Sequence, residues 1–151
     1  MRNENMSRVA MDLLSIPPLI FRLVRRKVVT DTLAEIDPTF KLLHFEILKV
    51  LKEEGTMHVA KIGEKLVIAK AQMTHLIDKL AELGFIERVT CQSDRRTVNI
   101  SLTTKGKKFM EVQDALILNA VRENMTSLTD NELEALSGSL RRLRDMLFKL
   151  G

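Results

Sequence analysis

The segment from Phe85 to Gly106 reads FIERVTCQSDRRTVNISLTTKG and predicts a small β-hairpin with a cationic tip. Residues Thr97–Leu102 alternate strictly between polar and apolar, which is the pattern of a half-buried strand. The run Ile86–Cys91 contains several β-branched residues and alternates in part. All five residues between the two runs, Gln92–Arg96, are polar and suit a turn. A hairpin whose tip carries Asp-Arg-Arg is suited to contact a polyanion.

Two helices are predicted immediately before the hairpin. The first spans Val59–Leu66 and has Gly63 in its middle, where a glycine weakens a helix by about 1 kcal/mol unless a close crossing requires it. The second runs from Ala69 to Leu83 and ends at Gly84. Its single apolar stripe consists of Met73, Leu76, Ile77 and Leu80. Two short helices joined by a tight turn predict a helix-turn-helix, and the hairpin that follows makes it a winged helix.

Upstream of this unit, Asp37 and Pro38 predict the start of a helix, with a capping oxygen followed by proline at the first helical position. This helix should end at Gly55 in the left-handed conformation, and residues 56–58 should form a very short strand. Farther upstream, we expect short helices over residues 1–15 and 19–33, because Pro17 and Pro18 break or start a helix. The basic residues of the second segment, Arg22, Arg25, Arg26 and Lys27, suit either a solvated face or a contact with DNA.

Two further helices are predicted after the hairpin. Thr103 or Thr104 can cap a helix from Lys105 to about Met125, and Thr129 with Glu132 forms a capping box for the last helix. That helix repeats leucine at heptad spacing, at Leu133, Leu136, Leu140, Leu143, Leu147 and Leu150. Such a seam packs either within its own chain or against a second copy. We favour the second copy, because the winged-helix core is complete without this helix.

The predicted fold is therefore mainly α-helical with a small β-hairpin wing. We divide the chain into N-terminal dimerisation helices over residues 1–36, a winged helix-turn-helix DNA-binding domain over 37–106, and C-terminal dimerisation helices over 107–151. The formal net charge is +4, and all of the excess lies in one third of the chain. Residues 57–108 hold ten Lys or Arg against five Asp or Glu, and the rest hold fourteen against fifteen. Such clustering arises by chance or marks a face that meets phosphates.

The composition and the absence of certain motifs restrict the expected cellular compartment and the expected chemical activities. A single cysteine, Cys91, excludes an intramolecular disulfide, and no apolar run approaches the roughly 20 residues that span a membrane. The N-terminus does not resemble a signal peptide, so we expect a cytoplasmic protein. His44, His58 and His75 lack the spacing of a zinc site, and no catalytic triad or glycine-rich phosphate loop is evident. We therefore predict no enzyme activity, no metal and no cofactor.

The segment SDRRTVNISLTTKGK, following a helix that ends in LGFIER, resembles the MarR (multiple antibiotic resistance regulator) family of transcription factors. The resemblance extends over nearly the whole chain. It implies a homodimer with interlaced terminal helices that binds a pseudo-palindromic operator in double-stranded DNA, with recognition helices about 34 Å apart. It also implies a repressor, which is the usual mode of the family. The repressor would release DNA when a small phenolic or carboxylate effector enters a cleft near residues 18–28, His44 and the helix after Gly106.

In such a protein the second helix of the helix-turn-helix enters the major groove. Its solvent face carries the candidate DNA-binding residues Lys70, Gln72, Thr74, His75 and Lys79. Lys70 and Gln72 are the candidates for reading bases, because Lys can reach guanine and Gln can pair with adenine. Lys79 is expected to meet phosphate. Without a DNA partner, all five side chains would simply be solvated.

The resemblance also assigns roles to the wing. It implies that Arg96 enters the minor groove, that Asp94 steadies Arg96 through an ion pair, and that Arg95 meets phosphate. Three positions depart from the family, because Ala69 and His58 stand where Ser or Thr often caps a helix, and Val67 stands where a glycine is common. Cys91 is interpreted as a small wing residue rather than a redox sensor. The rival hypothesis is a winged-helix adaptor that binds proteins and not DNA, with little dependence of affinity on salt.

Overall fold

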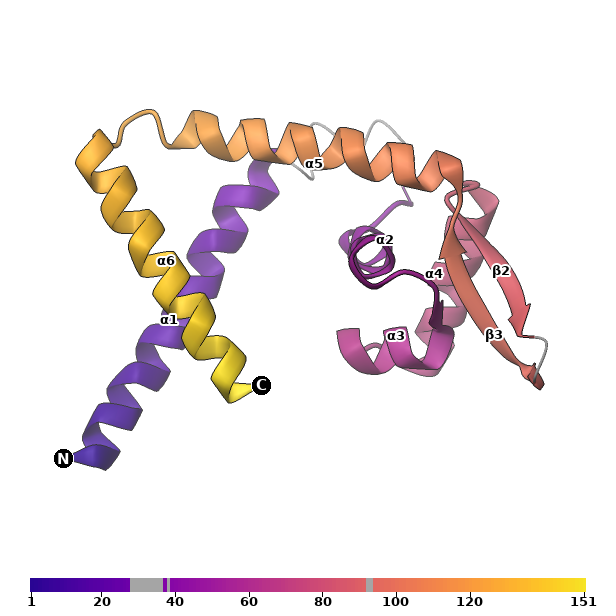
Figure 1. The fold of residues 1–151 in the computed structure, drawn as a ribbon, viewed down its shortest axis with the longest axis horizontal. Coiled ribbons are helices and arrows are strands. Elements are labelled where there is room, and N and C mark those ends of the chain that lie inside the picture. Colours follow the sequence, from indigo (N-terminus) through magenta and orange to yellow (C-terminus); the bar gives the residue numbers. More distant parts are fainter. Residues whose placement is uncertain (28–36, 38, 92–93) are drawn as a thin grey trace.

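The computed structural model of the chain describes residues 1–27, 37, 39–91 and 94–151, and the side chains of residues 24–27, 91 and 94–96 fall outside that description. Helices and strands follow in the order α1 (Arg2–Lys27), α2 (Leu42–Glu54), β1 (Met57–His58), α3 (Val59–Leu66), α4 (Lys70–Glu82), β2 (Ile86–Cys91), β3 (Asp94–Leu102), α5 (Thr104–Asn124) and α6 (Asp130–Leu150). Figure 1 shows α2–α4 and the strands gathered at one end of the long helix α5, with α6 and most of α1 toward its other end. This is the predicted mainly helical fold with a small antiparallel sheet.

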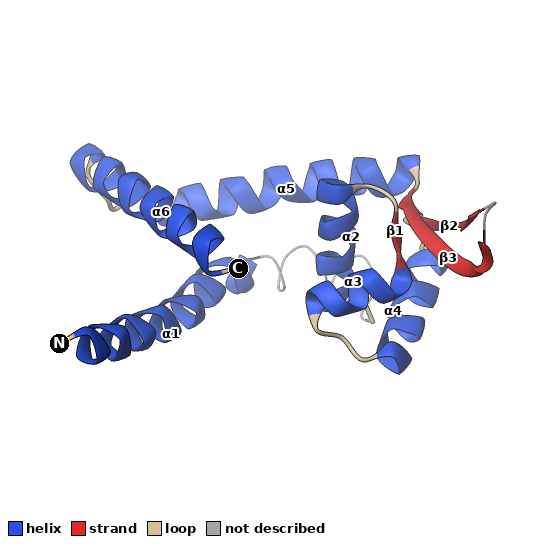
Figure 2. Ribbon diagram, turned by 60° about the horizontal axis from the view of Figure 1, so that its bottom comes forward, coloured by secondary structure: helices blue, strands red, loops and turns tan. Residues whose placement is uncertain are grey.

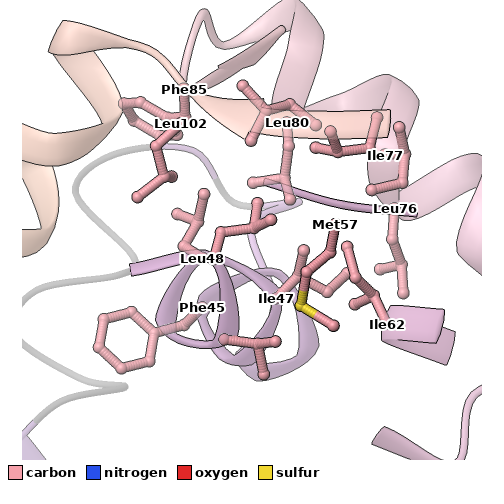
Figure 3. Close-up of a cluster of buried hydrophobic side chains, with 14 of the residues drawn as sticks. Phe45, Ile47, Leu48, Met57, Ile62, Leu76, Ile77, Leu80, Phe85 and Leu102 are labelled. Atoms are coloured by element: carbon pink, nitrogen blue, oxygen red, sulfur yellow. The ribbon is translucent and has the colours of Figure 1, made fainter. Parts of the chain in front are cut away.

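The winged-helix unit is built around one apolar core. Side chains from α2, α3, α4 and the sheet converge on it, as Figure 3 shows. The three strands lie in the order β1-β3-β2 and are antiparallel, with Met57 opposite Ile100 and Ile86 opposite Leu102. The very short strand predicted at residues 56–58 is thereby confirmed over Met57–His58, and it attaches the helix-turn-helix to the hairpin.

The crossing of α3 and α4 confirms the predicted role of Gly63. A Cβ atom at this position would lie 3.1 Å from the Cγ atom of Met73 and 3.3 Å from the carbonyl oxygen of Ile68. A side chain at this position would therefore fit only if Met73 or the turn shifted by a few tenths of an ångström. The turn between them places Val67 in the left-handed conformation, with φ 55° and ψ 50°. That conformation is unfavourable for a β-branched residue.

The start of α5 is fixed against the turn between α4 and β2. Thr103 caps the helix, since its Oγ1 atom accepts a hydrogen bond from the Gly106 N–H at 3.0 Å and donates one to the Gly84 carbonyl at 2.6 Å. A Cβ atom on Gly106 would lie only 2.1 Å from the Phe85 carbonyl oxygen. The capping residue is thus Thr103 rather than Thr104, and the helix can begin there only with glycine at this contact.

The outer helices bury much less. Figure 2 shows α1 and α6 diverging from each other, although they overlap in the view of Figure 1. α1 makes contact with α5. The predicted capping box of α6 is confirmed, with Thr129 and Glu132 bonded in both directions. α6 nevertheless has no buried residue, and four of the six leucines of its seam are exposed within the single chain, with Leu140 at 47%.

Several local expectations were wrong. α1 continues through Pro17 and Pro18 as one helix, because the loss of two backbone donors kinks or weakens a helix without having to end it. The expected helical residues beyond Lys27 lie outside the described residues. α2 begins at Leu42, and Asp37 instead caps a turn by accepting from the backbone N–H of Thr39 at 2.7 Å.

Two other turns also differ from expectation. Gly55 ends α2 with φ 80° but ψ −155°, so its φ is positive while its conformation is not the left-handed helical one. The hairpin turn is shorter than five residues, because β3 already begins at Asp94 and Cys91 pairs with it. Alternation predicted only the regular part of this strand, and Arg95 and Arg96 therefore lie in β3 rather than in the turn.

Candidate nucleic-acid interface

The exposed face of α4 carries four of the predicted DNA-binding residues. Met73, Leu76, Ile77 and Leu80 are buried and hold the helix against the core. Lys70, Gln72, Thr74 and His75 are all exposed. The backbone N–H of Met73 bonds to the carbonyl of the N-cap residue Ala69 at 2.9 Å, and no side chain caps the helix. A rigid helix therefore presents polar side chains to solvent.

These four side chains do not form one compact cluster. Successive residues on an α-helix are about 100° apart, so Lys70 and Gln72 leave α4 about 200° from each other. Lys70 and Thr74 lie on the side of α4 that faces the wing, where both line a groove. The Thr74 hydroxyl donates to the Lys70 carbonyl at 3.3 Å. The two predicted base-reading residues consequently flank the helix, and each would meet a different edge of a bound groove.

Lys79 has a partner that the sequence did not reveal. Its Nζ atom lies 2.8 Å from Oδ2 of Asp37 and 3.9 Å from Oε2 of Glu82, and its side chain is 21% exposed. The hydrogen bond from Lys79, with those from Thr39, holds the pKa of the Asp37 carboxyl well below its usual range, and the same pair raises the pKa of Lys79. Lys79 thus joins the end of α4 to the segment before α2, and its contact with phosphate stays a prediction.

The wing residues can be placed only in part. The backbone of Asp94, Arg95 and Arg96 forms the start of β3, beside a register shift between Thr90 and Cys91 on β2. The side chains of the three residues, and that of Cys91, lie outside the described part of the chain. Their predicted roles stay predictions. Beyond the tip, β2 and β3 pair regularly from Thr90 to Ile86, which anchors the hairpin to the core.

An ion pair between the wing and the recognition helix was also missed. Arg88 on β2 donates through Nη2 to Oδ1 of Asp78 on α4. The two side chains are 49% and 58% exposed. Asp78 lies on the solvent face of α4, and strand register brings Arg88 above it. No spacing rule connects a helix residue with a strand residue ten positions later, so the sequence carried no signal for this pair.

His44 occupies a structural position. It is buried, its Nδ1 atom accepts a hydrogen bond from the backbone N–H of Lys41 at 2.8 Å, and its ring stacks on Phe40 with centroids 5.2 Å apart. Burial lowers the pKa of His44. The ring therefore belongs to the N-terminal cap of α2. Of the other residues expected at an effector cleft, 28 lies outside the described residues, as do the side chains of 24–27.

Similarity to known proteins agrees with this geometry. The family model for MarR matches residues 40–98, which span α2, the helix-turn-helix and most of the wing. Residues 40–98 therefore form a MarR-family domain. Members are transcriptional regulators and not enzymes, in agreement with the expectation from the sequence. The relatives of this chain include the HTH-type transcriptional regulator TtmR of Methylorubrum extorquens (strain PA1), which is 34% identical over 67% of this chain and 51% of that protein.

Solved MarR-type structures share the fold. A MarR family protein from Bacillus stearothermophilus superposes with a TM-score of 0.74 at 22% identity, covering 96% of this chain and 97% of that one. BpsR of Bordetella bronchiseptica superposes with a TM-score of 0.59 at 20% identity, covering 86% and 98%, and its structure concerns regulation of its DNA binding by 6-hydroxynicotinic acid. By sequence, the matched region spans between 40% and 69% of the lengths of the curated relatives. None of the helices that the structure describes is both long and apolar enough to cross a membrane.

Proposed function

We propose that this chain is a sequence-specific regulator of transcription that binds double-stranded DNA. α4 would enter the major groove, and the hairpin of β2 and β3 would reach the adjacent minor groove. The observation that carries the proposal is the exposed polar face of α4, held on a buried core beside a cationic hairpin. Base edges in the major groove offer acceptors to Lys70 and both a donor and an acceptor to Gln72.

The same proposal gives the wing its role. Arg96 would insert into the minor groove, Asp94 would orient it, and Arg95 would meet phosphate. A narrow minor groove concentrates negative potential, so an arginine there adds affinity without reading a unique base code. Thr74 and His75 lie on the exposed face of α4 within reach of the same duplex, whereas Lys79 would act mainly by fixing the end of the helix.

We further propose that the regulator is a homodimer on a pseudo-palindromic operator. The exposed leucine seam of α6 and the exposed apolar residues of α1 support this, because a second copy would cover both. Two copies would place two α4 helices in successive major grooves about 34 Å apart. Residues 1–36 and 107–151 would then serve dimerisation, and residues 37–106 DNA binding.

Repression relieved by a small phenolic or carboxylate effector is the proposed mode of control. Support comes from BpsR, whose regulating compound carries both a ring hydroxyl and a carboxylate. The proposal includes action in the cytoplasm, where the operator DNA would be accessible to the protein.

Operators selected from random duplex DNA by the purified chain provide the direct test. We expect tight binding to an inverted repeat, with an affinity that falls steeply between two salt concentrations. Arg96→Ala should weaken binding to all sequences, whereas Gln72→Ala should change the preference among them. Lys49→Gln, on the exposed side of α2, is the matched control and should change neither. Partner binding that ignores salt, with no DNA bound in dilute buffer, would establish the adaptor hypothesis instead.

A further inference from the structure

A groove of about 800 Å³ is lined by α3, α4 and the turn between them, together with Arg88 and Val98 of the wing, and we call it the α4–wing groove. Val67 of the turn and Val98 of β3 supply its exposed apolar surface, and the buried residues Met73 and Ile77 lie beneath it. Two cationic side chains, Lys70 from α4 and Arg88 from β2, also line it, together with Glu64 of α3. The groove thus combines a hydrophobic wall with two basic residues.

The position of the groove follows from the proposed mode of binding. If α4 occupies a major groove and the hairpin the neighbouring minor groove, one DNA strand must pass between them. Residues of both α4 and the wing line the α4–wing groove, so the groove offers a path for that strand. Deoxyribose rings offer apolar surface to its wall, and the phosphates between them need cations at its rim.

Arg88 is held in this groove by an exposed ion pair. Both Arg88 and Asp78 are about half exposed, and pairs of that kind contribute little net stability because water solvates the separated charges well. Guanidinium carries five N–H donors, and the bond to Asp78 uses one Nη2 donor. Breaking the pair is therefore easy, and a phosphate could replace the carboxylate with similar geometry.

We propose that the α4–wing groove seats the DNA strand between the major and minor grooves, and that Arg88 exchanges Asp78 for a phosphate of that strand. The inference rests on the proposed DNA-binding function and adds to it a backbone contact outside both the recognition helix and the wing tip. Arg88 would contribute affinity without sequence preference. Asp78 would oppose binding, because its carboxylate competes with phosphate for the same guanidinium.

The first test changes Arg88. Arg88→Gln should weaken binding about five- to twentyfold, by the same factor on the selected operator and on a scrambled duplex. The slope of log affinity against log salt should become shallower by about 0.9, the value for one phosphate contact on B-DNA. Arg88→Lys should retain the slope, and Lys49→Gln should leave both affinity and slope unchanged. Circular dichroism confirms that each variant is folded before DNA is added.

The second test changes Asp78. Asp78→Asn should tighten binding about three- to tenfold on both duplexes, since Arg88 no longer has a carboxylate to leave. Glu87→Gln removes an equal charge from the exposed residue next to Arg88 on β2 and should change affinity less than twofold. An equal gain in both variants would mean general charge repulsion and would overturn the exchange.

Other results contradict the proposal separately from the proposed function. An unchanged salt slope in folded Arg88→Gln would show that no phosphate lies at Arg88. Weaker binding by Asp78→Asn would show that the ion pair persists in the complex as a brace. Failure of the wild-type chain to bind any duplex would refute the DNA-binding function itself.

Discussion

The winged-helix unit and the outer helices differ in how far their apolar residues are buried. All seventeen buried hydrophobic residues that the structure describes lie between Phe40 and Met110. In α6, by contrast, no residue is buried, and Leu136, Leu140 and Leu147 remain 40–47% exposed. The winged-helix unit buries its hydrophobic surface within the chain, whereas α6 presents a hydrophobic surface that another molecule must cover. Substitutions in the winged-helix unit should therefore change the folding of the chain, whereas substitutions in the seam of α6 should change its association with another molecule.

The largest effect is expected at Gly106, where the winged-helix unit meets α5. In Gly106→Ala, the new methyl group would lie 2.1 Å from the Phe85 carbonyl oxygen and would force the backbone of α5 or β2 to move. Because Thr103 and Phe85 are bonded at the same place, we expect the free energy of unfolding to fall by about 3 kcal/mol. Denaturant titration of the full chain measures it.

Gly138 in α6 provides the matched control. A Cβ atom there meets nothing within 4 Å, and the residue lies on the side of α6 opposite the leucine seam. Gly138→Ala should therefore stabilise α6 by up to about 1 kcal/mol. Equal destabilisation by the two substitutions would show that α6 is packed as closely as the winged-helix unit, contrary to the comparison above.

The next largest effect concerns the leucine seam. Leu140→Asp places a charge on the surface that a second copy would cover, and we expect the solution mass to fall to that of one chain at micromolar concentration. Ala135→Asp adds the same charge away from the seam and should leave the mass unchanged. Light scattering at several concentrations distinguishes them. A wild-type chain that is monomeric throughout this range would refute the dimer.

A smaller effect is expected at the contact between the segment before α2 and the end of α4. Asp37→Asn removes the carboxylate that Lys79 contacts at 2.8 Å, so the melting temperature at pH 7 should fall. The folded-state pKa of Asp37 is depressed, so its contribution is present above the unfolded pKa near about 4 and is lost as pH falls below it. The variant and the wild type should therefore converge in strong acid. A difference that persists at low pH would mean that the carboxylate acts other than by its charge.

His44 should give the winged-helix unit a weak dependence of stability on pH. Burial lowers the pKa of His44, so the unfolded chain binds the proton more readily than the folded one. Stability should be fully present above about pH 6.5 and decline as pH falls below it. His44→Gln retains an acceptor for the Lys41 N–H and removes the titration, so its melting temperature should vary less between pH 7 and pH 5. An identical profile in both proteins would assign the dependence to another group.

Sequence patterns predicted the regular elements of this fold, whose apolar residues recur at helix or strand spacing. Periodicity located every helix of the winged-helix unit and the short strand at Met57, and the family resemblance agreed with the structural comparisons. Gly63 was understood correctly because a mid-helix glycine has few explanations. The positions that failed depend on tertiary context. Asp37 reads as a helix cap, yet its partner Lys79 is brought to it by folding.

In the candidate interface, too, some features could be predicted from the sequence and others depended on tertiary structure. Exposure of Lys70, Gln72, Thr74 and His75 followed from the apolar stripe of α4, because the residues opposite a buried stripe are solvated. The ion pair of Arg88 with Asp78 could not be predicted, since it needs the register of β2 against α4. His58 was expected to leave α3 uncapped, whereas its Nδ1 atom accepts from the Ala60 N–H at 3.1 Å. Cap rules that consider only Ser, Thr, Asp and Asn overlook a histidine in this role.

Val67 gives the smallest expected effect, and it is opposite in sign to the others in this unit. Its φ of 55° and ψ of 50° place a β-branched residue in the left-handed region, and its side chain is 92% exposed, so it packs against little that offsets the strain. Val67→Gly should relieve that strain, although glycine also makes the unfolded chain more flexible, and the net gain should be about 0.5–1 kcal/mol. Val67→Ala is the control, because it shortens the side chain without the conformational freedom of glycine. If denaturant titration shows both variants equally stabilised, the gain comes from the exposed side chain, and the turn of the helix-turn-helix is not strained.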